Sequence, residues 1–399
     1  TSRRQRQMCI RDSLKDKANI SAPEHSKVSI IHGENILSDV TDSVMGKMAE
    51  KGIVLLENDG SLPLKENAQK ILITGYNADN KLAYLGNYFG DPSHFVMVTD
   101  AVCEYNSETE FIRGIHLYDS EKNSDEQLAL EKAKNSDIIL MCTGLDSSIE
   151  GEEAGGALAG GGGNIGNQGD RENIDLPINQ QEYIEKLIKT GKKVVLLNFS
   201  GGCINFGKFK NRVKAILQCW YPGAQGGKAI ADILFGKCSP SGKLPVTFYN
   251  STDDLPDFCD YSMQNRTYRY FNGKVQYPFG YGKTDTKFAL KNTEVCENKI
   301  RATVKNVGDV ESETVLQLYV TYPAADFKTP IKSLIDCKRI LLKPQEEKNF
   351  EFEFDETKLL TVNDDGEKVL LSGVYNFYLT DGCDFESKAF SYFQSIENQ

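Results

Sequence analysis

The hydrophobic pattern of this chain changes character near residue 289. Before that point, short apolar runs alternate with segments in which apolar residues recur every three or four positions. The runs predict buried strands at 53–56, 71–75, 137–142, 193–199 and 213–219. The segments between them predict helices, and this alternation is typical of a largely parallel sheet with helices on both faces.

The helix boundaries can be read from capping residues and glycines. The expected helices are one capped by Ser38 or Thr41 and ended by Gly52, one at 125–136, one at 178–190 before Gly191, and one opening at Gly226. From about residue 289 onward, short runs of alternating apolar and polar residues take the place of this pattern, and the alternation is strict at 350–354. Short strands at 301–304, 315–320, 350–354 and 374–379, separated by turn signals and without helices, predict a β-sandwich of roughly a hundred residues.

The chain of 399 residues is therefore expected to hold two main domains. An α/β sandwich domain at 41–250 and a β-sandwich at 289–395 are joined by a connector at 251–288 that is rich in aromatic residues and proline. Residues 14–40 are expected to form a second connector. Residues 1–13 are basic in an acidic chain and resemble translated adapter sequence, so we interpret them as a non-native leader on a fragment of a longer protein.

Composition excludes several classes of protein. The net charge of −11 and the absence of a basic stretch in the domains argue against a nucleic-acid partner. No apolar run approaches the length of a membrane span. The ten cysteines form no CxxC pair and the four histidines are scattered, so we expect neither a disulfide framework nor a metal site, and no cofactor.

The candidate chemistry lies in a loop that follows the strand at 137–142. Three acids, Glu150, Glu152 and Glu153, crowd into four positions there, ahead of a glycine-rich stretch that ends in Asp170 and Arg171. Ligands of α/β sheets bind beyond the carboxyl ends of the strands, where acids on a loop can act as general acids or bases. The alternative is an acidic surface loop that is simply solvated.

Other motifs carry less information. Residues 161–166 match G-x-G-x-x-G, but they do not follow a strand directly or open a helix, so a nucleotide-binding role is disfavoured. Residues 222–228 lack the first glycine and the Ser/Thr of a phosphate-binding loop, and their glycines indicate tight packing between strand and helix. Aromatic and arginine residues at 266–271 and 277–282 favour packing between the domains over sugar stacking.

A set of ordered motifs resembles glycoside hydrolase family 3, over about residues 40–395. The matching segments are IVLLEN at 53–58 with LPL at 62–64, GNYFG at 86–90, GDR at 169–171, WYPG at 220–223, PSGKLP at 240–245, RTYRY at 266–270 and YPFGYG at 277–282. The last third of the chain is similar to the family's fibronectin type III-like domain.

The resemblance implies a retaining β-glycosidase. In that mechanism an Asp on a (β/α)8 barrel is the nucleophile, and a Glu on a loop of the α/β sandwich domain donates the proton, with the two carboxyl groups about 5 Å apart. Matching the family pattern places the proton donor at Glu152, with Glu153 and Glu150 as runners-up. Asn87, Tyr88 and Arg171 are the implied substrate-binding residues.

No barrel motif occurs in this sequence, so the implied nucleophile lies on a missing barrel domain of the same protein. The expected substrate is an oligosaccharide or aryl β-glycoside with a terminal β-D-glucosyl or β-D-xylosyl residue, and the chain alone is expected to be inactive. Export to the periplasm or the medium is compatible with such an enzyme. The rival interpretation is a non-catalytic accessory protein that binds carbohydrate.

Overall fold

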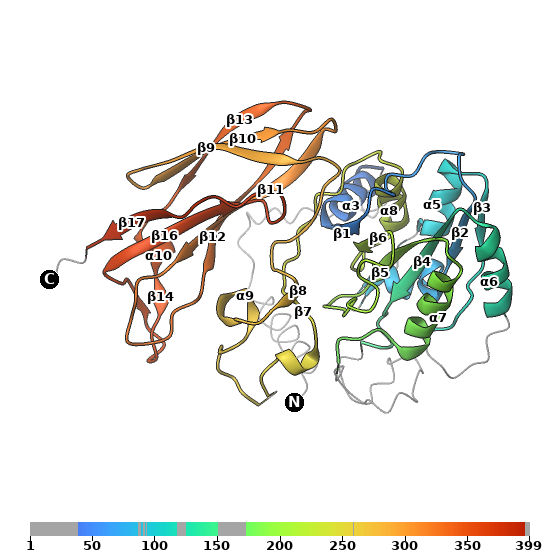
Figure 1. Ribbon diagram of the computed structural model, residues 1–399, viewed down its shortest axis with the longest axis horizontal. Coiled ribbons are helices and arrows are strands. Elements are labelled where there is room, and N and C mark those ends of the chain that lie inside the picture. Colours follow the sequence, from blue (N-terminus) through green and yellow to red (C-terminus); the bar gives the residue numbers. More distant parts are fainter. Residues whose placement is uncertain are drawn as a thin grey trace, which may run out of the picture. The chain divides into compact units, whose positions relative to one another are not determined.

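A computed structural model of the chain describes residues 39–86, 89–90, 92, 94–117, 125–150, 173–257 and 259–395. Most of these residues belong to one compact unit, Val44–Gln399. Within this unit, an α/β domain is followed by an all-β domain, which confirms the fold class expected from the sequence (Figure 1).

Six strands of the described chain form the sheet of the α/β domain. In spatial order they are β1 (Val54–Asn58), β6 (Ala215–Gln218), β5 (Lys193–Phe199), β4 (Ile138–Gly144), β2 (Ile71–Thr74) and β3 (Thr109–Phe111). Every neighbouring pair is parallel except β1 with β6 at one edge. All seven residues of β4 are buried, as expected of a central strand with both faces covered.

Helices cover both faces of this sheet. Because side chains alternate along a strand, Ile138, Leu140 and Cys142 point to one face, and Ile139 and Met141 to the other. The described helices on the first face are α3 (Asp39–Gly52, which belongs to this unit from Val44 onward), α5 (Val98–Tyr105) and α8 (Gly226–Leu234), and on the second face α6 (Glu126–Asn135) and α7 (Ile178–Lys189). Two short helical turns, η1 (Tyr76–Ala78) and α4 (Leu82–Leu85), follow β2.

The all-β domain packs two antiparallel sheets around one apolar core. One sheet contains β13 (Glu347–Glu353), β10 (Lys299–Asn306) and β9 (Phe288–Cys296). The other contains β12 (Ser333–Leu342), β11 (Ser312–Thr321), β16 (Gly373–Thr380) and β17 (Phe390–Gln394). A short helix α10 (Glu356–Leu359) and the small pair β14 (Thr361–Val362) and β15 (Lys368–Val369) complete the described part.

The segment between the two domains is ordered by its aromatic residues. It contains β7 (Phe248–Tyr249), η2 (Thr252–Asp254), α9 (Thr267–Tyr270) and β8 (Val275–Tyr277). The Tyr268 ring stacks on Phe279 with centroids 4.2 Å apart and meets Tyr319 of β11 edge-on. Gln317 of β11 donates a hydrogen bond to the Gly280 carbonyl. These contacts agree with the interpretation of this motif as packing between domains.

The helix α3 ends at Gly52, as the sequence predicts. Of the apolar residues along it, Val44 and Met48 are exposed and Ala49 is buried. Of the helices in the described ranges, none is both long enough and apolar enough to span a bilayer.

Candidate functional site

The candidate site lies where the parallel strands β2, β4 and β5 end. β4 leads into the acidic loop through Gly144, whose φ is +119°. A Cβ at this position would lie 2.0 Å from the Phe199 carbonyl oxygen, so only glycine allows β4 and β5 to approach this closely. The same holds for Gly75 at the end of β2, where a Cβ would lie 2.1 Å from the Cys142 carbonyl oxygen.

A buried glutamine from α7 fixes the end of β4. The Gln180 Oε1 accepts hydrogen bonds from the Thr143 hydroxyl at 2.6 Å and from the Gly144 N–H at 2.9 Å. Its Nε2 donates to the Gly144 carbonyl at 2.9 Å. Gln180 is only 2% exposed, so water does not reach this point. Its side chain takes the place of water as the partner of the Gly144 N–H and carbonyl.

The first residues of the loop turn around Asp146. Its buried carboxylate accepts hydrogen bonds from the Asn80 amide at 2.7 Å and from the Ser148 N–H and hydroxyl at 2.8 and 2.6 Å. The Asp146 carbonyl accepts from the N–H groups of Ile149 and Glu150. Asn77 of η1 donates to the carbonyls of Thr143 and Leu145. The segment that follows β2 therefore holds the start of the acidic loop.

Glu150 is the one predicted catalytic candidate within the described residues. Its Oε1 accepts a hydrogen bond of 3.0 Å from the Gly201 N–H, just after β5. The Tyr221 ring, from the segment after β6, lies beside it: a Cβ on Gly201 would be 3.0 Å from Tyr221 Cε2 and 3.2 Å from Glu150 Oε2. Burial, and then the Glu150 carboxylate, raise the pKa of the Tyr221 hydroxyl well above its usual value.

Tyr221 also contacts the start of the GNYFG motif. A Cβ on Gly86 would lie 2.5 Å from Tyr221 Cδ2, so this ring packs directly on Gly86. Asn87 and Tyr88 follow Gly86 immediately, and Glu152 follows Glu150 by two positions. The structure thus brings together, around Tyr221, the segments that lead into two of the predicted site regions.

The remaining predicted site residues lie outside the described residues. These are Glu152, Glu153, Asn87, Tyr88 and Arg171. The chain is described again from Asn173, and its return is anchored: Ile174 donates its N–H to the Thr252 hydroxyl, and its carbonyl accepts from the Asn205 N–H at 2.8 Å.

The supporting residues were not predicted. Gln180, Asp146, Asn77, Asn80 and Gly201 carry no motif of their own, and their partners are brought to them by the fold. The one available signal is that Asp146 and Gly201 come directly after apolar runs, at strand ends where ligands bind in such sheets.

The glycines of residues 222–228 serve packing. A Cβ on Gly227 would lie 2.2 Å from the Met97 carbonyl carbon, and a Cβ on Gly226 would lie 2.4 Å from the Pro222 ring. Lys228 pairs with Asp232 one turn later in α8. This agrees with the interpretation of the segment as tight packing rather than a phosphate site. In the described ranges, no three His, Cys, Asp or Glu side chains are arranged to hold a metal ion.

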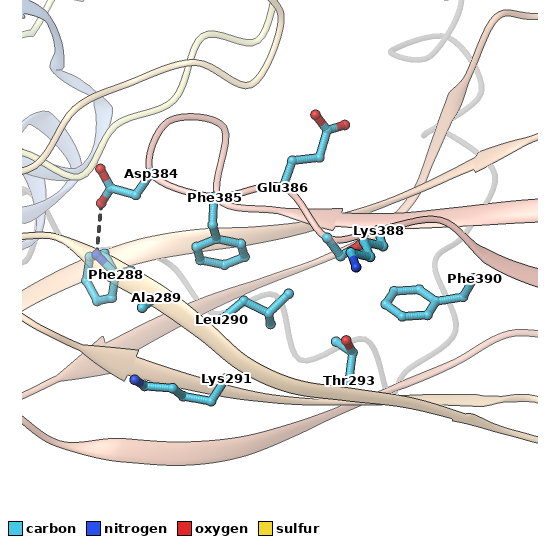
Figure 2. A pocket seen from close by; sticks show the side chains of 11 residues that line it. Phe288, Ala289, Leu290, Lys291, Thr293, Asp384, Phe385, Glu386, Lys388 and Phe390 are labelled. Atoms are coloured by element: carbon cyan, nitrogen blue, oxygen red, sulfur yellow. Dashed lines mark hydrogen bonds between the residues drawn. The ribbon is translucent and has the colours of Figure 1, made fainter.

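A cavity in the all-β domain is also lined by acids, Asp384 and Glu386, but it lies away from the candidate site. It has a volume of about 500 Å³ and opens between β9 and the segment leading into β17. Figure 2 shows Phe385, Leu290 and Phe390 along it, and the Asp384 carboxylate accepting the Phe288 N–H at 2.9 Å. Burial raises the pKa of Asp384. Because Asp384 is engaged with the backbone, we assign it a structural role.

Comparison with known proteins places the chain in a family. Residues 53–284 match the sequence model of the glycosyl hydrolase family 3 C-terminal domain, and residues 314–382 match that of a fibronectin type III-like domain. A xylan 1,4-beta-xylosidase of Xylanibacter ruminicola is 39% identical over 229 residues, which cover 56% of this chain and 26% of that protein. A beta-xylosidase of Formosa agariphila is 30% identical, over 82% of this chain and 47% of that protein.

Solved structures agree with this placement. A GH3 beta-glucosidase of Bifidobacterium adolescentis superposes with a TM-score of 0.80 at 26% identity, covering 93% of this chain and 56% of that one. The chain thus spans about half or less of the length of the relatives it matches. The family match covers more than half of this chain and includes every described residue of the site, and so the chain belongs to glycosyl hydrolase family 3, as a C-terminal domain followed by a fibronectin type III-like domain.

Proposed function

We propose that this chain supplies the general acid/base of a retaining β-glycosidase that removes terminal non-reducing β-D-xylosyl or β-D-glucosyl residues. The observation that carries the proposal is the fixed start of the acidic loop at the carboxyl ends of β4 and β5, in a chain whose relatives are named as xylosidases and glucosidases. Acids on a loop at this edge of a parallel sheet are placed where ligands bind.

Glu152 is the proposed proton donor. A donor must be free to face the glycosidic oxygen, and its pocket must keep it protonated near neutral pH. Glu150 is a poorer candidate because its carboxylate already accepts the Gly201 N–H and lies against the Tyr221 ring. We therefore assign Glu150 to holding the loop, with Glu153 as the alternative donor. Asn87, Tyr88 and Arg171 remain proposed substrate contacts.

The reaction needs a second carboxyl group as the nucleophile. The family resemblance assigns it to an Asp on a (β/α)8 barrel domain, and the described part of the chain forms no such barrel. After attack at the anomeric carbon expels the protonated leaving group, Glu152 would deprotonate the water that hydrolyses the glycosyl-enzyme. The chain by itself would then be inactive.

The test is Glu152→Gln in the full-length enzyme, with Glu153→Gln and Glu150→Gln as matched variants. General acid catalysis contributes about 10²–10⁴-fold, so E152Q is expected to lose that much kcat/KM on xylosides or glucosides with poor leaving groups. It should lose far less on dinitrophenyl glycosides, which need no protonation, and added azide should restore turnover of these. E153Q and E150Q should not show this dependence on the leaving group.

Comparable rates for wild type and E152Q on both substrate classes would contradict the assignment. The same leaving-group dependence in E153Q would move the donor to Glu153. Sugar binding without hydrolysis by the full-length protein would favour the accessory interpretation instead.

A further inference from the structure

The segment that follows β6 begins with an unusual backbone conformation. Trp220 has a φ of +59°, which is rare for a residue other than glycine and strained for a bulky one. The chain before it is fixed, because the Cys219 N–H donates to the Asn198 carbonyl at 2.8 Å. The chain after it is fixed as well, because the Gly223 N–H donates to the Tyr84 carbonyl at 2.8 Å. Backbone contacts on both sides therefore hold the strain in place.

The Trp220 side chain adds a further anchor. Its indole Nε1 donates to the Gly52 carbonyl at 3.0 Å, where α3 ends. Its ring meets Phe248 of β7 edge-on, with the ring centroids 6.3 Å apart. Strained backbone persists only where the surrounding structure fixes it, and such residues cluster at functional sites. The side chain whose direction this conformation sets is the next one, Tyr221.

The Tyr221 ring packs against two glycines from different segments. One edge of the ring faces both of them: a Cβ on Gly86 would lie 2.5 Å from Cδ2, and a Cβ on Gly201 would lie 3.0 Å from Cε2. Gly86 opens the GNYFG motif, and the Gly201 N–H holds Glu150 at the start of the acidic loop. Because the rigid ring touches both segments, it sets the spacing between them.

The Tyr221 hydroxyl lies beside Glu150. It is buried and has no hydrogen bond of normal geometry within the described chain. Burial raises the pKa of Tyr221 well above its usual value and the Glu150 carboxylate raises it further, which places the two groups close together. A buried donor without an acceptor is costly, and hydrogen bonds of catalytic groups are often misaligned in a free enzyme and tighten when substrate binds. Glu150 is the acceptor that lies beside this hydroxyl.

We propose that Tyr221 is a positioning residue of the proposed active site. Its ring spaces the GNYFG motif from the acidic loop, its hydroxyl donates to the Glu150 carboxylate, and the strained Trp220 backbone aims the ring. Because the hydroxyl is buried, Tyr221 acts through these two segments and not on the substrate itself. The inference rests on the proposed function, since this spacing affects catalysis only if the acidic loop carries the proton donor.

The first test compares Tyr221→Phe with Tyr221→Ala in the full-length enzyme, on an aryl β-xyloside or β-glucoside. Y221F keeps the ring and loses the hydroxyl, so kcat should fall about tenfold while KM stays within about twofold. Y221A also releases the GNYFG segment, so KM should in addition rise by roughly fivefold or more. The matched control is Tyr277→Phe, because Tyr277 is buried and its hydroxyl donates to Glu57 of β1 at 3.0 Å. Y277F should leave kcat and KM within about twofold of wild type, although it too loses a hydrogen bond to a glutamate.

A second test needs no enzymatic activity. Trp220 is the only tryptophan in the sequence, so its emission reports urea unfolding of the 399-residue chain from a position next to Tyr221. Wild type, Y221F, Glu150→Ala and the double variant form a double-mutant cycle. Y221F should raise the unfolding constant about fivefold in the wild-type background. In the E150A background it should raise it less than about twofold, because the acceptor of the hydroxyl is already gone.

A wild-type kcat in Y221F would overturn the proposal, as would additive effects in the unfolding cycle. A loss of kcat in Y277F as large as in Y221F would also overturn it, because the loss would then follow from any missing buried hydroxyl. If E152Q shows the expected leaving-group dependence while Y221F keeps its kcat, the positioning role fails and the proposed function stands. Coupling in the unfolding cycle, in an enzyme that hydrolyses neither xylosides nor glucosides, would support the contact between Tyr221 and Glu150 and reject the proposed function.

Discussion

At the scale of single residues, the glycine that bears directly on the acidic loop is Gly201. Gly201 donates its N–H to Glu150, and a Cβ at this position would crowd both Tyr221 Cε2 and Glu150 Oε2. Cβ contacts of 3.0–3.2 Å force the neighbours to shift, and at Gly201 the neighbours are the residues that hold the loop. Gly202, the next residue, has nothing within 4 Å of such a Cβ.

This pair allows a matched test of the loop anchor. We expect Gly201→Ala in the full-length enzyme to lower kcat/KM about ten- to a hundredfold, because displacement of Glu150 moves the proposed donor that follows it. Gly202→Ala should stay within twofold of wild type. The measurement is steady-state kinetics on an aryl glycoside, with thermal unfolding to check folding. Equal activity of the two variants would show that Gly201 does not position the loop.

The sequence was sufficient to predict the acidic residues of the candidate site, but not the residues that hold the loop in place. Glu150, Glu152 and Glu153 are visible because three acids follow a buried strand within four positions. Asp146 and Asn80 meet across 66 positions, and the Gln180 amide reaches Gly144 across 36. Such contacts form only once the register of the sheet is set. A single amide or carboxylate in the sequence therefore does not reveal which distant residue it will bind.

At the scale of elements, strong hydrophobic patterns were sufficient to predict the positions of helices and strands. The strand expected at 193–199 is β5, Lys193–Phe199, and the helix expected at 178–190 is α7, Ile178–Lys189. Several of the strands that were missed have weak patterns. β3 has three residues, none of them buried, and β9 and β12 carry mixed polar residues at exposed positions. Their pairing with a neighbouring strand, rather than their own sequence, makes them strands.

The element most directly coupled to the site is α7, through Gln180. We expect Gln180→Ala to lower the free energy of unfolding by roughly 2–4 kcal/mol, because it leaves the Gly144 N–H and carbonyl buried without partners. Urea unfolding of the full chain measures this. Glu182→Ala on the exposed side of the same helix is the control and should change stability by less than about 0.5 kcal/mol. A similar small loss for Q180A would mean that other groups fix the end of β4.

At the scale of the whole molecule, a hydrogen-bonded link between the two domains passes beside a half-buried acid, Asp285. Asp285 lies in the segment that leads into β9, and its N–H donates to the Ser239 hydroxyl, which in turn accepts from Ser312 of β11. Burial raises the pKa of Asp285 to about 6. The folded chain therefore retains a proton there at a pH where the unfolded chain has released it.

Stability should accordingly fall as the pH rises from about 4 through about 6. The contribution of Asp285 is fully present below its unfolded pKa and is lost above its folded pKa. We expect Asp285→Asn to be more stable than wild type by about 1–3 kcal/mol at pH 7.5, and the difference to shrink towards zero by about pH 4. Urea unfolding of both proteins across this range tests it. A difference that is independent of pH would contradict a raised pKa.

The contacts that hold Glu150 and Ile174 have a consequence for how the length of the segment between them can vary among members of this family. Glu150 is tied to Gly201 on one side, and Ile174 to Thr252 and Asn205 on the other. None of these contacts involves the 22 residues from 151 to 172. Doubling the length of a loop between fixed ends costs only about 0.6 kcal/mol of closure entropy. A change in the number of residues between these two anchors, at positions other than the proposed site residues Glu152, Glu153 and Arg171, would therefore cost little closure entropy and leave the anchoring contacts unchanged.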